Sequence, residues 1–96
     1  MKELIATYKH LLNEVLPATY TQPVRVDHCF NRIVLDWLFQ DCWYNHLSRK
    51  QTAVSQLSAT QLQQANERME LWLKDQQMLI DDNEASLRYR NKKRNR

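Results

Sequence analysis

The 96-residue chain contains no glycine. Glycine adopts positive φ angles readily and lets the backbone approach a phosphate group closely. Its absence excludes the P-loop, the dinucleotide-binding G-x-G-x-x-G turn, the G-x-S-x-G nucleophile turn and the usual EF-hand loop. Tight two-residue hairpins are also disfavoured, because they depend on Asn-Gly or Asp-Gly pairs. This one feature removes several classes of nucleotide-binding protein and enzyme, and it favours no single function.

Hydrophobic periodicity predicts an all-α fold. Apolar side chains recur at helical spacing over residues 2–16, 27–46 and 62–81. Pro17 is expected to end the first helix, because the residue before a proline avoids the α region. Residues 17–26 contain both prolines of the chain and predict an extended connector.

The start of the third helix carries the clearest local signal. Ser58 and Gln61 match a capping box, and Leu57 with Leu62 would supply the hydrophobic staple. The polar residues 48–57 before this point predict a loop with at most one helical turn.

The segment from residue 27 to residue 46 is the most apolar part of the chain. Its apolar residues cover most of the helix circumference, which is typical of a helix buried on several sides. We therefore place this helix at the centre of a small three- to four-helix bundle, with residues 1–87 as a single helical domain.

The cysteine and hydropathy patterns predict a cytoplasmic protein. Cys29 and Cys42 would lie about 20 Å apart on one helix. That distance is too long for a disulfide, so reduced thiols are expected. No apolar stretch reaches the length of about 18 residues that a membrane-spanning helix needs. Charged residues near the N-terminus interrupt any signal-peptide core.

Positive charge is concentrated at the C-terminal end. Six of the last nine residues are basic: Arg88, Arg90, Lys92, Lys93, Arg94 and Arg96. The rest of the chain carries eight basic and eleven acidic residues. Residues 88–96 are therefore predicted to be a basic, disordered tail. Two interpretations of the tail stay open: contact with the phosphates of a nucleic acid, or a solvated segment that raises solubility.

A row of polar residues crosses the apolar central segment. Its members are spaced four residues apart, so they would form one ridge on a helix beside Trp43: His28, Arg32, Asp36 and Gln40. A buried charged ridge is costly unless its members pair, and Arg32 and Asp36 are within reach of each other. Two interpretations stay open. His28, Arg32, Asp36 and Trp43 form a ligand pocket or contact surface in which the arginine holds an anion, or the ridge is a structural ion pair.

A metal site or a cysteine–histidine catalytic pair is less well supported. Cys42 and His46 have a spacing that suits two zinc ligands, but a full site needs two more. Nothing marks an oxyanion hole or a third catalytic group. We therefore predict no metal, no cofactor and no catalytic residue.

Two motifs give the chain a resemblance to a known group of proteins. Residues 27–33 are Asp-His-Cys-Phe-Asn-Arg-Ile, and residues 83–90 are Asn-Glu-Ala-Ser-Leu-Arg-Tyr-Arg. Across residues 25–90 the chain resembles small uncharacterised bacterial proteins that share a D-H-C-F-x-R-I core and a later N-x-x-S-L-x-x-R stretch. Some of those proteins are labelled as related to GNAT acetyltransferases, whose glycine-rich acetyl-CoA loop has no counterpart here. The resemblance implies no reaction and marks six positions for testing: Asp27, His28, Arg32, Asp36, Asn83 and Arg88.

Together these patterns predict a small helical binding or interaction module that forms a dimer. The bulky side chains, with three tryptophans, exceed what three short helices are expected to cover, and an exposed remainder marks a partner surface. A homodimer or another protein would cover it. Two alternatives stay open: a nucleic-acid accessory protein that uses the basic tail, and a small enzyme that acts on an anionic metabolite through the ridge. The balance of the patterns is against an enzyme.

Overall fold

The computed structural model of the protein describes residues 1–20 and 27–94, which form helices joined by short turns, with no strand in these two ranges. In chain order the elements are α1 (Lys2–His10), the π-helical turn η1 (Leu11–Val15), α2 (Leu16–Thr19), α3 (Asp27–Phe39), the 3₁₀ turn η2 (Trp43–Asn45), α4 (Ala53–Gln56), α5 (Ala59–Lys74) and α6 (Gln76–Arg94). The predicted all-α fold is confirmed. Within the described residues, no helix is long and apolar enough to cross a membrane.

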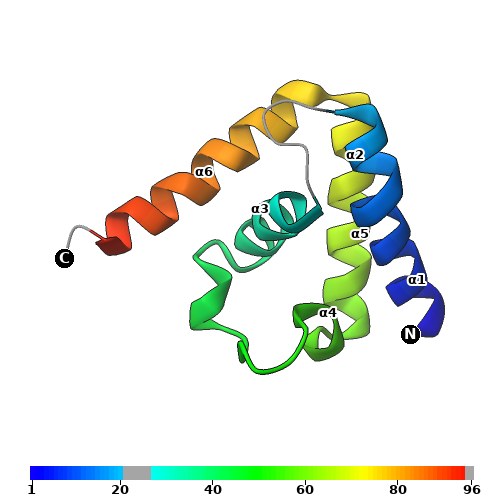
Figure 1. The fold of residues 1–96 in the computed structure, drawn as a ribbon, viewed down its shortest axis with the longest axis horizontal. Coiled ribbons are helices and arrows are strands. Elements are labelled where there is room, and N and C mark those ends of the chain that lie inside the picture. Colours follow the sequence, from blue (N-terminus) through cyan, green and yellow to red (C-terminus); the bar gives the residue numbers. More distant parts are fainter. Residues whose placement is uncertain (21–26, 95–96) are drawn as a thin grey trace.

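Helix α3 lies at the centre of the fold (Figure 1). Helices α1 and α5 run side by side along one flank, while α6 packs against α3 and extends away from α1 towards the C-terminus. Four apolar side chains of α3 have no exposed surface: Phe30, Ile33, Val34 and Leu35. From α5, the side chains of Leu62, Met69 and Trp72 are equally buried. The central position predicted for the most apolar helix is confirmed.

The first helix was expected to end at Pro17, but helical structure continues past this residue. Helix α1 continues into the π-helical turn η1 and then into α2, which contains Pro17 and ends at Thr19. A proline inside an α-helix has no N–H to donate, and its ring clashes with the carbonyl four residues earlier. The wider π turn, closed by the N–H of Leu16 on the carbonyl of Leu11, changes the hydrogen-bond register just before the proline. The expected connector is therefore helical up to residue 19, and its residues 21–26 lie outside the described part of the chain.

The predicted single helix over residues 27–46 is wrong, because α3 ends before Gln40. Gln40 has a positive φ of 54°, and its N–H bonds to the carbonyl of Trp37 at 3.2 Å. The N–H of Asp41 bonds to the carbonyl of Asp36, also at 3.2 Å. These two bonds form a Schellman motif, in which glycine usually takes the left-handed position. The chain has no glycine to place there, so a glutamine adopts this conformation at a cost of about 1 kcal/mol.

The third helix begins as predicted but ends early. The capping box is confirmed, since Ser58 Oγ accepts the N–H of Gln61 at 3.1 Å and Gln61 Oε1 accepts the N–H of Ser58 at 2.9 Å. Helix α4 is the one helical turn expected in the loop before it. The expected end near Asp81 is wrong, because Asp75 is extended (φ −145°) and ends α5. Its Oδ1 then accepts the N–H of Met78 at 3.3 Å and caps α6.

Helix α6 occupies most of the segment that we expected to be a disordered tail. The helix runs to Arg94, so helical structure replaces the disorder expected from residue 88 to that point. Arg96 lies outside the described residues, as do the side chains of residues 92–94. The inner face of α6 is largely polar: the side chains of Asp82 and Ser86 are only 8% and 1% exposed.

Candidate functional site

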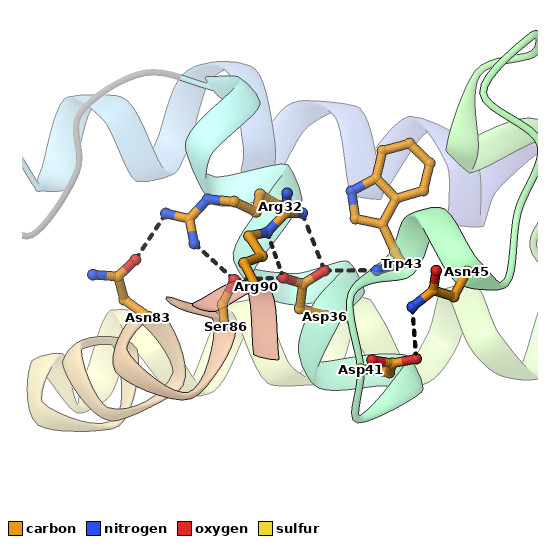
Figure 2. A network of polar contacts seen from close by, with 8 residues as sticks. All are labelled: Arg32, Asp36, Asp41, Trp43, Asn45, Asn83, Ser86 and Arg90. Atoms are coloured by element: carbon orange, nitrogen blue, oxygen red, sulfur yellow. Dashed lines mark hydrogen bonds and ion pairs between the residues drawn. The ribbon is translucent and has the colours of Figure 1, made fainter. Parts of the chain in front are cut away.

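A network of hydrogen bonds and one ion pair joins α3 to α6 around Asp36 (Figure 2). The side chain of Asp36 has no exposed surface. Its Oδ2 accepts the hydroxyl of Ser86 at 2.5 Å and Nε of Arg90 at 3.1 Å. Its Oδ1 accepts the backbone N–H of Trp43 at 2.9 Å and a longer contact from Nη2 of Arg90 at 3.4 Å. Each oxygen of the buried carboxylate therefore has donors, and a cation lies beside it, which offsets the cost of its burial.

Arg32 lies one turn before Asp36 on α3, but it does not form the expected direct ion pair. Its Nη1 donates to Ser86 Oγ at 2.7 Å, and its Nη2 donates to Asn83 Oδ1 at 2.8 Å. Burial lowers the pKa of Arg32, and the charge of Arg90 lowers it further. The hydroxyl of Ser86 accepts from Arg32 and donates to Asp36, so it links the two charged groups in place of direct contact.

Arg90 supplies the ion pair with Asp36. Burial opposes its charge, but the hydrogen bond and the charge of Asp36 outweigh burial and raise the pKa of Arg90. Its guanidinium also lies 4.9 Å from the centroid of the Tyr44 ring, which is a cation–π distance. Arg90 was expected to belong to a free basic tail, and the structure instead places it in the network that holds α6 on α3.

Helical spacing explains why these residues meet. On α6, Asn83, Ser86 and Arg90 are spaced three and four residues apart, so they share one face, and this face lies against the arginine and aspartate of α3. The two motifs that carry the resemblance therefore face each other. Arg88, which the resemblance marked, is exposed and outside the network. Arg90, the last residue of the second motif, makes the contact with Asp36.

The structure brings the predicted ridge together only in part. Trp43 lies in η2 and not on the central helix, and its main-chain N–H, not its ring, contacts Asp36. The indole ring packs against the core and lies edge-on to Tyr44, with 4.7 Å between ring centroids. The side chain of His28 lies outside the described residues, as does that of Asp27, which the resemblance also marked.

The contacts of this network hold α6 against α3. The carboxylate of Asp36 is enclosed by contacts from both α6 and η2. The network contains two guanidinium groups, Arg32 and Arg90, for one carboxylate, so it carries an excess of positive charge. Arg32 is half-buried and its described hydrogen bonds go to neutral oxygens.

A second buried carboxylate, Asp82, ties α5 to α6. Its Oδ2 accepts Nε of Arg68 and Nε1 of Trp72, both at 2.8 Å, and its Oδ1 accepts Nη2 of Arg68 at 2.9 Å. The guanidinium of Arg68 also lies 4.8 Å from the ring centroid of Trp37. This cluster was not predicted from the sequence, because Asp82 lies just beyond the last apolar segment, residues 62–81. The sequence signal that could have indicated it is the four-residue spacing of Arg68 and Trp72, which places both donors on one face of α5.

An open groove lies between the end of α3 and the middle of α5. Its volume is about 400 Å³. Its apolar wall consists of Trp37, Leu38 and Leu71, and Leu71 is 44% exposed. The polar part of its lining is Gln40, Gln64, Glu67 and Arg68. An apolar centre with a polar rim is typical of a surface that contacts a partner.

Cys42 and His46 have no further candidate metal ligands grouped with them in the described part of the chain. The described residues contain no group of three or more side chains that could hold a metal ion. Cys42 is 4% exposed, and both cysteines are free thiols. His46 lies 3.2 Å from Asp41 and stacks on Phe39 with 4.8 Å between ring centroids. The pKa of Asp41 is lowered, first by its hydrogen bond from Asn45 and also by His46.

Comparison with known proteins does not add a relative to this picture. No family model matches the chain, and the searches of curated proteins and of solved structures find no significant match. The resemblance to small bacterial proteins stays a prediction.

Proposed function

We propose that the protein is a small helical interaction module that forms a homodimer through the exposed face of α5. The observation that supports this proposal is the apolar wall of the groove, where Leu71 is 44% exposed beside the half-buried Trp37 and Leu38. A large apolar side chain left uncovered in a groove favours contact with a partner, since burying it removes apolar surface from water.

The charge pattern on α5 favours a second copy of the same chain as that partner. Glu67, Leu71 and Lys74 are spaced four and three residues apart and share one exposed face. A two-fold interface brings the same patch of both subunits together. If two α5 helices pack antiparallel around Leu71, Glu67 lies opposite the partner's Lys74, and the same pair forms a second time across the axis.

The alternative of an enzyme acting through the ridge has less support. Catalysis of proton transfer requires a group within hydrogen-bond reach of the substrate. Asp36 has no exposed surface, and its acceptor positions are occupied by Ser86, Arg90 and the N–H of Trp43. These contacts suit a structural carboxylate.

The test is the oligomeric state of charge-exchange variants. Sedimentation equilibrium over about a hundredfold range of concentration should show a monomer–dimer equilibrium for the natural chain. Glu67→Lys should weaken the dimer, because it places two cations opposite each other. The double variant Glu67→Lys, Lys74→Glu should restore it by exchanging the charges. Leu71→Asp should abolish it.

Glu3→Lys is the matched control, because it makes the same charge change at an exposed position on α1. This variant should dimerise like the natural chain. A monomer at every concentration, or a double variant that dimerises no better than Glu67→Lys alone, would overturn the proposal.

A further inference from the structure

We propose that the surface formed by Tyr44, Arg49 and the adjoining face of α6 at Tyr89 and Arg90 binds single-stranded nucleic acid. In this arrangement the exposed ring of Tyr44 stacks on a base, and Arg49 contacts the phosphates. This surface involves other residues than the dimer face on α5, so the two proposals stand or fall separately.

The first observation is an exposed aromatic ring between cations. Tyr44 is 41% exposed. The guanidinium of Arg49 lies 4.2 Å from its ring centroid, and that of Arg90 lies 4.9 Å from it. An aromatic ring that can accept a base, combined with arginines beside it, is the arrangement that single-strand-binding proteins use.

The second observation is that the charge of Arg49 is available. Arg49 is exposed, and none of the ion pairs in the described residues involves it. Arg90 is different, because its charge is taken up by Asp36 and its role is to hold α6 in place. The nearby carboxylate of Asp41 is itself engaged by Asn45 and His46.

The third observation is that two separate segments meet here. The hydroxyl of Tyr89 on α6 donates to Gln40 Oε1 at 3.3 Å, and Arg90 contacts Tyr44, so the basic half of α6 lies beside the turn η2. Figure 1 shows this half of α6 on the side of the molecule away from α1.

Single-stranded nucleic acid fits these observations better than an anionic membrane does. Both would be attracted by the positive charge. Only a nucleic acid, however, offers a flat π-surface to a tyrosine ring that is flanked by guanidinium groups. An anionic membrane is therefore the competing outcome of the test.

The experiment measures fluorescence anisotropy of labelled single-stranded oligothymidylate and oligouridylate titrated with the full chain. Binding should weaken as salt increases. Tyr44→Leu should weaken it at least about fivefold, whereas Tyr44→Phe keeps the ring and should bind almost normally. Arg49→Glu should weaken binding and lower the salt dependence by about one phosphate contact.

The matched control is Lys9→Glu, which makes the same charge change at an exposed position on α1. It should bind nearly as tightly as the natural chain. Circular dichroism and thermal melting check that each variant is folded. Arg49→Glu keeps the test decisive if Tyr44→Leu is unstable, because Arg49 is an exposed loop residue.

Several results would overturn the proposal. One is the absence of oligonucleotide binding at low salt. Equal weakening by Lys9→Glu and Arg49→Glu would show attraction by net charge alone. If Tyr44→Leu bound normally and inorganic polyphosphate competed as well as the oligonucleotide, the surface would be a plain polyanion site. Binding to vesicles that contain phosphatidylserine, without oligonucleotide binding, would assign the surface to membranes instead.

Discussion

Replacing Asp36 by alanine should loosen α6 and destabilise the whole protein. The substitution leaves the hydroxyl of Ser86, the guanidinium of Arg90 and the N–H of Trp43 without their common acceptor. Removing one partner of a buried ion pair costs about 3–5 kcal/mol. The side chain of Arg90 is 22% exposed, so water can reach it in part, and we expect a loss of about 3 kcal/mol. A domain of this size has a total stability of about 5–15 kcal/mol.

Urea denaturation followed by circular dichroism measures this loss. In thermal melting it should appear as a decrease in Tm of about 12–24 °C, since 1 kcal/mol corresponds to about 4–8 °C in a small domain. Asp81→Ala is the matched control: Asp81 is an exposed aspartate of α6, and its loss should cost at most about 1 kcal/mol. If Asp36→Ala cost no more than Asp81→Ala, the structural role assigned to Asp36 would be refuted.

Three further predictions use the same denaturation assay. Gln40→Gly should be more stable than Gln40→Ala by about 1 kcal/mol, because both variants lose the side-chain hydrogen bonds of Gln40 and only glycine adopts the left-handed conformation without strain; equal stability of the two variants would contradict this account of the helix end. Asp82→Ala should cost about 3 kcal/mol, because it leaves the indole N–H of the fully buried Trp72 without its acceptor, and tryptophan fluorescence should change with it. Burial raises the pKa of Tyr8 above its ordinary value. The free energy of unfolding should therefore be unaffected by this group below about pH 10 and should decrease above that pH by up to about 1.4 kcal/mol per pH unit. Tyr8→Phe should make this decrease less steep, and an equally steep decrease in the variant would show that other groups cause it.

The elements that were predictable from the sequence are those with a local cause. Periodic apolar residues identified α1, α3 and α5, and the capping box at Ser58 located the start of α5. The two interruptions were not predictable, because apolar spacing continues across both of them. At Gln40 the left-handed turn has no glycine to mark it. At Asp75 an aspartate that looks like an ordinary helix-surface residue ends one helix and caps the next.

Of the candidate site, the residues on α3 were predictable from the sequence and most of their partners on α6 were not. Arg32 and Asp36 stand out as charges in an apolar segment, so their importance could be inferred from the sequence. Their partners, Asn83, Ser86 and Arg90, lie in a segment without apolar periodicity, because the face of α6 that packs on α3 is polar. Hydrophobic patterns do not detect a helix that docks through hydrogen bonds.

That polar face has a consequence for how the molecule fluctuates. When α6 separates transiently from α3, water can replace each lost partner of Arg32 and Arg90. The opening of an apolar interface would instead expose hydrophobic surface to water. Such partial opening should therefore not promote aggregation. The backbone amide hydrogens in the C-terminal half of α6 should exchange with solvent well before those of α3, whose side chains are held by the apolar core.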